Sequence, residues 1–322
     1  MPDGLDAEVV LSLSPDSRLA AFNRAGLLAA ADIHVASALG RLGGDRDELV
    51  ALAVALAVRA PRVGHVLADL HTVRDTAIAG IEEQADLSEL PWPLPEAWLE
   101  RLRCSPLVAV GEDGPGDRPV RLVGSSLYLD RYWRDETDVA VDLIARSNAP
   151  PVDVDTDLLS EGLARLYRDS QSGLQQQAVV TALERRLSVI AGGPGTGKTT
   201  TVARLLALVI AEGLRGAGPP PLIALAAPTG KAAARMAEAV HDEARNMDID
   251  PPVRQLLLDL GASTVHRLLG RRPGSSTRFR HDRNNRLPHE VVVVDETSMM
   301  SLPLMARLVE AVRPDARLVL VG

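Results

Sequence analysis

The sequence feature that most constrains the fold is a glycine-rich stretch between an apolar run and a helical pattern. The stretch is Gly192 to Thr199 (GGPGTGKT), with SVIA before it and TTVARLLALVI after it. It fits the phosphate-binding loop pattern, in which glycines let successive backbone N–H groups turn toward one anion and the following helix adds the positive end of its dipole. The stretch therefore predicts a strand, a phosphate site and a helix, in that order.

The polar residues of this loop have expected roles. Lys198 reaches the outer phosphates of a nucleotide, and Thr199 places its hydroxyl on Mg²⁺. The alternative is a glycine-rich turn that binds nothing. The expected ATP ligands in the loop are Gly192, Gly193, Pro194, Gly195, Thr196, Gly197, Lys198, Thr199 and Thr200.

Two carboxylates follow an apolar run farther along the chain. Val291 to Val294 are four consecutive valines, which predict a strand buried on both faces, and Asp295 and Glu296 come next. Two carboxylates at the end of a buried strand cost free energy unless they bind a cation or hydrogen-bond to a water molecule. We expect Asp295 to bind Mg²⁺ and Glu296 to orient or deprotonate the attacking water, so Lys198 and Glu296 are the candidate catalytic residues. The alternative is an acidic pair that caps the next helix.

Strand and helix patterns alternate through the second half of the chain. Helices are expected at about 174–185, 198–211, 231–240 and 302–312, and strands at 187–191, 222–227, 291–294 and 317–321. This order predicts an α/β domain with a parallel sheet and helices on both of its faces.

The first half has a different pattern. From Asp16 to about Leu90, apolar residues recur at three- and four-residue spacing, which predicts helices. The apolar runs 106–110 and 120–123 suggest a β-hairpin, and the proline-containing segment 147–156 is the expected linker. We therefore expect a mainly helical, partner-docking domain over residues 1–146 and the α/β domain over residues 147–322.

Charge also separates the two halves. Residues 1–150 hold 24 Asp and Glu against 14 Arg, a net of −10, whereas residues 151–322 hold 19 Asp and Glu against 21 Lys and Arg, a net of +2. An acidic first half does not resemble a nucleic-acid surface, while the second half has room for a local basic groove. Only two of the 35 basic residues are lysines, Lys198 and Lys231.

Composition narrows the class of protein further. Cys104 is the single cysteine, which excludes an internal disulfide and a zinc site of several cysteines, and we expect it to be a small buried residue. The longest apolar runs stop at about ten residues, short of a bilayer span, and the first thirty residues are acidic where a secretory signal needs a basic start. We expect the protein to stay in the cytoplasm.

Four segments, in this order, resemble helicase motifs. The phosphate loop resembles motif I, residues 225–233 (LAAPTGKAA) motif Ia, residues 263–269 (STVHRLL) motif Ib, and residues 295–299 (DETSM) motif II. Together they resemble superfamily 1 DNA helicases of the 5′-to-3′ class. The tract 127–136 (LYLDRYWRDE) is similar to the N-terminal domain of those members that serve as subunits of a heterotrimeric recombination enzyme.

This resemblance implies a RecA-like fold for the α/β P-loop NTPase domain, with ATP and Mg²⁺ as cofactors. It implies ATP-driven unwinding of DNA ends for double-strand break repair, with a 5′ single-stranded tail and duplex DNA as partners and two sister subunits bound to the chain. Gln175 would read adenine. The DNA contacts that the resemblance implies are Thr229, Lys231, Thr264 and His266.

The residues alone leave alternatives open for these contacts. A strand that ends in Ala-Pro-Thr-Gly-Lys suits a phosphodiester oxygen, yet an ordinary helix cap has the same geometry. His266 would by default be a packed histidine. The arginine-rich stretch 271–286 is either a solvated loop or a DNA-facing one.

Two rival functions also remain. One is a nucleotide-binding and partner-docking module without turnover, and the other is a small-molecule kinase, against which the Pro-Thr-Gly-Lys segment and the Asp-Glu pair argue. The chain ends at the strand pattern 317–322, where the helicases continue into motif III. We therefore expect a chain that lacks the rest of this domain and a second RecA-like domain.

Overall fold

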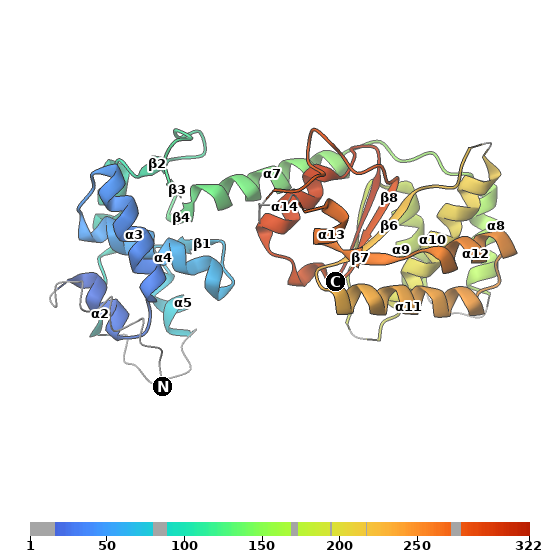
Figure 1. Cartoon of the computed structure of the whole chain (residues 1–322), viewed down its shortest axis with the longest axis horizontal. Coiled ribbons are helices and arrows are strands. Elements are labelled where there is room, and N and C mark those ends of the chain that lie inside the picture. The colour runs from blue at the N-terminus through green and yellow to red at the C-terminus, as the bar shows by residue number, and fades with distance from the viewer. Residues whose placement is uncertain (1–16, 80–88, 169–172, 194, 217, 272–277) are drawn as a thin grey trace. The chain divides into compact units, whose positions relative to one another are not determined.

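The computed structural model describes residues 17–79, 89–168, 173–193, 195–216, 218–271 and 278–322 (Figure 1). The chain divides into two compact units, Met1–Glu136 and Thr137–Gly322. This division falls ten residues before the expected boundary, because the second half of helix α7 (Asp130–Ser147) belongs to the second unit. There the Arg146 guanidinium donates to the carbonyl oxygens of Val312 and Arg313 at 2.7 and 2.9 Å.

The first unit combines helices with a small sheet, in the order β1-β4-β3-β2. The expected helical character is confirmed, but the sheet includes β1, which lies inside the stretch that the spacing predicts as helical. The helices are α2 (Arg18–Arg24), α3 (Ala30–Gly43), α4 (Glu48–Arg59), η1 (Ala60–Val63), α5 (Val73–Ala79), α6 (Pro95–Cys104) and the first half of α7; the strands are β1 (Leu67–Asp69), β2 (Val108–Val110), β3 (Val120–Val123) and β4 (Ser126–Leu129).

The predicted hairpin between residues 106–110 and 120–123 is wrong. Strand β2 pairs with β3 in parallel, and β3 instead forms the hairpin with β4. Gly124 and Ser125 connect these two strands, and Gly124 has a φ of 62°. A two-residue loop with a glycine in this region is the favoured hairpin connection, so β4 takes the antiparallel position beside β3.

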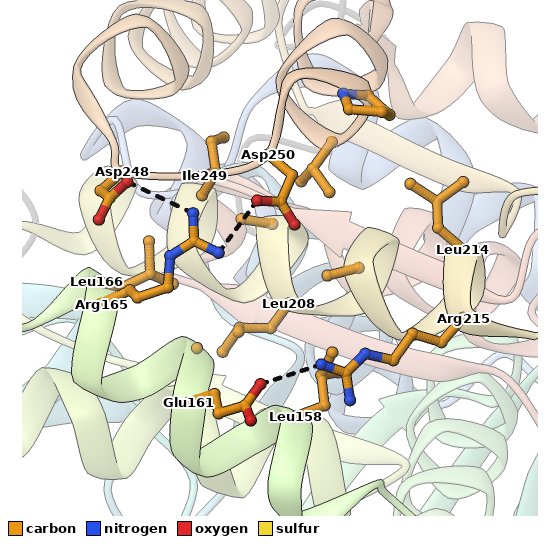
Figure 2. Close-up of a pocket in the computed structure, with 15 residues that line it drawn as sticks. Leu158, Glu161, Arg165, Leu166, Leu208, Leu214, Arg215, Asp248, Ile249 and Asp250 are labelled. Carbon is orange, nitrogen blue, oxygen red and sulfur yellow. Dashed lines mark hydrogen bonds and ion pairs between the residues drawn. The ribbon is translucent and has the colours of Figure 1, made fainter.

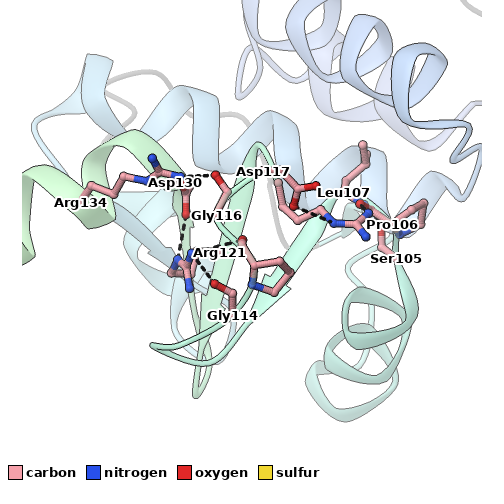
Figure 3. A network of polar contacts seen from close by, with 11 residues as sticks. Ser105, Pro106, Leu107, Gly114, Gly116, Asp117, Arg121, Asp130 and Arg134 are labelled. Carbon is pink, nitrogen blue, oxygen red and sulfur yellow. Dashed lines mark hydrogen bonds and ion pairs between the residues drawn. The ribbon is translucent and has the colours of Figure 1, made fainter.

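A buried arginine organises the loop between β2 and β3 (Figure 3). Arg121 is 3% exposed, and its Nε donates to Asp130 Oδ1 at 2.8 Å. Its terminal nitrogens donate to the loop carbonyls of Gly111, Glu112, Gly114 and Pro115 at 2.8 to 3.4 Å. The arginine therefore holds this loop against the sheet and satisfies carbonyl groups that the sheet does not use.

Helix α6 explains why the expectation for Cys104 is wrong. Trp98, Leu99 and Leu102 face the core, and the Trp98 indole donates to the Leu49 carbonyl at 2.7 Å. Cys104 is the last residue of the helix and lies two positions beyond Leu102, about 200° around the helix axis. It is exposed because its side chain leaves on the polar side.

The second unit is the expected α/β domain. Its sheet has five strands in the order β5-β9-β8-β6-β7, and all of its pairs are parallel. The elements are α8 (Thr156–Leu166), α9 (Gly173–Glu184), β5 (Leu187–Ile190), α10 (Lys198–Arg215), β6 (Ile223–Ala227), α11 (Gly230–Asn246), α12 (Pro251–Asp259), β7 (Ala262–Thr264), α13 (Val265–Leu269), β8 (Val291–Val294), η3 (Thr297–Met299), α14 (Leu302–Ala311) and β9 (Arg317–Val321).

Both faces of this sheet are covered, as predicted. In β8, Val291 and Val293 pack in one core with α10 and α11, while Val292 and Val294 pack in another with α13 and α14. All four valines are fully buried. Such a run without polar alternation is typical of a parallel strand between two helical layers. No helix among the described residues is long and apolar enough to span a membrane.

Candidate functional site

The strands of the parallel sheet bring most of the candidate residues to one edge. Ile190 of β5 pairs with Val321 of β9, Leu320 pairs with Val294 of β8, and Val294 pairs with Ala226 of β6. The phosphate loop, Asp295 and Thr229 follow the carboxyl ends of these strands, and Thr264 ends β7. In open α/β sheets this edge is where ligands bind.

The phosphate loop has the backbone that its glycines permit. Gly195 and Gly197 have φ values of 75° and 80°, and Gly197 is the residue before α10. The Lys198 ammonium folds over the loop and donates to the carbonyls of Gly192 and Gly193, the latter at 3.1 Å. The lysine thus lies over the loop in which the glycines and the helix start would hold a phosphate. Pro194 lies outside the described residues.

The end of β9 connects this loop to the segment after β8. Gly192 N–H donates to the Gly322 carbonyl at 3.1 Å, and Gly322 N–H donates to the Ile190 carbonyl at 3.2 Å. From the other side, the Thr297 hydroxyl donates to the Val321 carbonyl at 2.9 Å. The phosphate loop and the Asp295–Glu296 segment are therefore held by the same strand end.

Gln175 lies against the phosphate loop. Its Nε2 donates to the Thr196 carbonyl at 3.0 Å. Gly197 has a φ of 80°, which favours glycine at this position, and a Cβ there would also push the end of the Gln175 side chain aside. The structure thus places Gln175, from the start of α9, beside the phosphate loop.

Glu296 has an unusual backbone. Its φ is 53°, and it is the one non-glycine residue with positive φ among those described. Such strain costs about 1–3 kcal/mol and is concentrated at functional sites. The Glu296 N–H donates to Asp295 Oδ1 at 2.9 Å. Although Glu296 precedes η3, its side chain makes no capping hydrogen bond, which argues against the alternative of an acidic helix cap.

The donors at this edge fit a magnesium ion shared with phosphates. Thr199 is the second residue of α10 and offers a hydroxyl, and Asp295 offers a half-buried carboxylate. Mg²⁺ prefers oxygen ligands and is usually held by one or two carboxylates together with substrate phosphates. No group of three or more metal-binding side chains occurs in the described part of the chain.

Thr200 differs from the other loop residues. Its hydroxyl donates to Glu243 Oε1 on α11 at 2.7 Å, so its side chain is directed to that helix. Only its backbone N–H, in the first turn of α10, is positioned like those of the other expected ATP ligands. The sequence carries no local signal for this contact.

Both threonines expected to contact DNA are helix caps. The Thr229 hydroxyl accepts from Ala232 N–H at 3.2 Å at the start of α11, and the Thr264 hydroxyl accepts from Arg267 N–H at 3.2 Å at the start of α13. Lys231 is exposed in the first turn of α11. The His266 ring lies 5.9 Å from the Phe279 ring, which is the packing expected by default.

The arginine-rich stretch 271–286 is partly engaged within the second unit. Arg283 forms an ion pair with Asp142 at 3.0 Å, and Arg286 donates to the Val312 carbonyl at 2.7 Å. Residues 272–277 lie outside the described part of the chain. These two arginines therefore have structural partners.

A separate cavity of about 260 Å³ lies between α8, α10 and the segment before α12 (Figure 2). Leu158, Leu208 and Ile249 are among its apolar lining residues. On its rim Arg165 pairs with Asp250 at 3.2 Å, and Arg215 pairs with Glu161 at 3.1 Å. It adjoins the last turns of α10, whereas the phosphate loop adjoins the first, so this cavity is not the phosphate site.

Comparison with known proteins gives two domain matches. Residues 24–128 match the N-terminal domain of the RecBCD enzyme subunit RecD, and residues 175–322 match an AAA domain. The first match lies within the first unit, and the second covers the phosphate loop and the sheet of the second unit.

Similar proteins agree with these matches. The chain is 50% identical over 319 residues to the RecBCD enzyme subunit RecD of Mycobacterium tuberculosis, which covers 98% of this chain and 51% of that protein. It is 52% identical over 301 residues to the RecBCD enzyme subunit RecD of Mycolicibacterium smegmatis, which covers 92% of this chain and 50% of that protein. It is 35% identical over 200 residues to the ATP-dependent RecD2 DNA helicase of Deinococcus radiodurans, which covers 61% of this chain and 23% of that protein. The chain spans about half the length of the mycobacterial relatives, and over that half it is similar to the RecD subunits of the RecBCD enzyme.

Proposed function

We propose that the second unit binds and hydrolyses ATP with Mg²⁺, and that the chain contributes this motor site to a 5′-to-3′ DNA helicase subunit working with RecB and RecC in double-strand break repair. The observation that carries the proposal is the shared strand end. Gly322 bonds to the phosphate loop while Val321 bonds to Thr297, next to the Asp295–Glu296 pair. This shared strand end supports one nucleotide site that the phosphate-binding loop and the pair of carboxylates would serve together.

Each residue has a role in this proposal. Lys198 and the N–H groups at the start of α10 bind the outer phosphates, and Gln175 recognises the base. Thr199 and Asp295 would hold Mg²⁺, which supplies charge neutralisation at the phosphates. Glu296 is exposed at the strand end, where it accepts the proton of the attacking water.

The DNA contacts and the partner contacts belong to different units. Thr229 and Thr264 cap α11 and α13, and the N–H groups and positive dipole ends of helix starts suit DNA phosphates. Lys231 adds a positive charge there, and His266 lies in the next helix. The first unit, which matches the RecD N-terminal domain, binds RecB and RecC, and its acidic character steers it toward basic partner surfaces.

A second candidate is a nucleotide-binding and docking module that does not turn ATP over. The observation that favours it is the pair of domain matches, because an AAA domain and a RecD N-terminal domain also suit a module that binds a nucleotide and docks on a partner. Single-turnover ATP hydrolysis with and without single-stranded DNA separates the two. Hydrolysis that DNA accelerates supports the motor, whereas tight ATP binding with no hydrolysis under either condition supports the module.

A further inference from the structure

One contact joins the phosphate loop helix to the helix that starts at the expected DNA contacts. The Thr200 hydroxyl donates to Glu243 Oε1 at 2.7 Å. Thr200 is the third residue of α10, and Glu243 lies in the last turn but one of α11. Helix α11 starts just after β6 and packs against α10 (Figure 1).

Thr200 can respond to a bound phosphate because of its position. The first N–H groups of a helix have no partner within the helix, so a phosphate in the loop draws on those of Lys198, Thr199 and Thr200. The side chain of Thr200 is meanwhile held by Glu243. Any adjustment of this first turn therefore acts directly on a carboxylate of α11.

Helix α11 can transmit such an adjustment along its length. Met236, Val240 and Ala244 are buried in the same core as Val202 and Leu206 of α10. At the other end, the Thr229 hydroxyl fixes the first turn of α11 beside Lys231. A helix packed in this way moves as one body, because close-packed interiors shift between discrete arrangements and do not deform continuously.

We propose that the Thr200–Glu243 hydrogen bond couples nucleotide binding to DNA binding, with Glu243 as a positioning residue that touches neither ligand. This inference rests on the proposed function, since it needs both ligands to bind. In the contrary case, in which the contact only ties two helices together, its loss would lower stability and leave the coupling unchanged.

The test measures binding of a fluorescent oligothymidine with and without ATPγS and Mg²⁺. We expect the nucleotide to change oligothymidine affinity by about fivefold or more in the wild-type chain, within the usual range of coupling between sites. Glu243→Met keeps the side-chain length and removes the acceptor. It should bring that ratio below about twofold while the affinity for each ligand alone changes less than twofold.

Matched variants complete the design. Glu243→Gln keeps an oxygen acceptor and should retain the wild-type ratio, as should Glu238→Ala, which removes an exposed carboxylate from the same helix. Because coupling is reciprocal, oligothymidine must change ATPγS affinity by the same factor in each protein. Thermal unfolding of every variant identifies any loss of folding; if Glu243→Met does not fold, Thr200→Val, which removes the hydroxyl donor and keeps the shape of the side chain, takes its place and should lower the ratio in the same way.

Three outcomes are distinguishable. A ratio that collapses in Glu243→Met and survives in Glu243→Gln supports the coupling. An unchanged ratio in Glu243→Met overturns it and leaves the proposed function standing. A wild-type chain that binds neither ATPγS nor oligothymidine overturns the proposed function and the coupling together.

Discussion

Lys198 lies over the loop that would hold the outer phosphates, where it donates to two loop carbonyls. We expect Lys198→Ala to slow ATP hydrolysis by roughly 30- to 1,000-fold, because loss of one charge-assisted contact to the transition state costs about 2–4 kcal/mol. Steady-state phosphate release measures this. The exposed Arg185, just after α9, gives a matched control as Arg185→Ala. Equal rates in wild type and Lys198→Ala would contradict the assignment.

Glu296 should separate binding from hydrolysis. Glu296→Gln keeps the size and hydrogen-bonding capacity of the side chain, and its backbone meets the same φ requirement, but the base is lost. We expect hydrolysis to fall by roughly 100-fold or more while nucleotide affinity stays near that of wild type. Equilibrium binding of a fluorescent ATP analogue beside single-turnover hydrolysis checks this. Parallel losses in both would mean that Glu296 is a structural or metal-binding residue.

At the scale of single elements, the Arg121 network should stabilise the first unit strongly. Arg121→Ala leaves the carboxylate of Asp130 partly uncompensated and orphans the loop carbonyls, so we expect the free energy of unfolding to fall by about 3–5 kcal/mol. Arg121→Lys should not restore it, because an ammonium cannot span the planar set of acceptors. Urea denaturation of both, with the exposed Arg103→Ala as control, measures this. A lysine variant with wild-type stability would refute the argument.

Elements whose signal is local could be predicted from the sequence, and elements that depend on distant pairing could not. The strand Val291–Val294 and the turn-to-helix start at Lys198 follow from residues next to each other in the chain. The parallel pairing of β2 with β3 could not be predicted in this way. The antiparallel partner of β3 is β4, which follows it in the chain, and this leaves β2 to pair with β3 in parallel. Strand β1 has three residues, too few for an alternating pattern, and lies among helical spacings.

The candidate site shows the same division. The motif residues at the strand ends could be predicted, because parallel strands place their carboxyl ends at one edge. The contacts of Thr200 with Glu243, and of Gln175 with Thr196, span 43 and 21 residues and leave no periodic trace in the sequence. The exposure of Cys104 was missed because it depends on where α6 ends relative to its buried face.

At the scale of the whole molecule, the division inside α7 decides where the chain can be cut. We expect residues 137–322 to bind an ATP analogue as the full chain does. Residues 147–322 should melt at a lower temperature, because that cut removes Arg146 and leaves three carbonyls near the end of α14 without this donor. Burial lowers the pKa of Arg146, and the negative charge of Asp142 partly offsets that shift.

Thermal unfolding of the two truncated chains tests this division. The difference expected is about 2–4 kcal/mol in the free energy of unfolding, the scale for losing hydrogen bonds from a charged donor. Identical melting curves for the two chains would show that the second half of α7 contributes nothing to the second unit. If the shorter chain does not fold at all, Arg146 and its neighbours in α7 stabilise the second unit by more than this amount.

Because the chain has only two lysines among its 35 basic residues, chemical labelling of amines can be directed to very few positions. Besides the terminal amine, only Lys198 and Lys231 carry a primary amine, one in the phosphate loop and the other at the start of α11. Guanidinium groups stay protonated and are poor nucleophiles at ordinary pH. An amine-directed acylating reagent therefore labels Lys198, in the proposed ATP site, and Lys231, at the proposed DNA contact, and little else. Mass spectrometry of one reaction mixture then measures how far a nucleotide protects Lys198 and how far DNA protects Lys231.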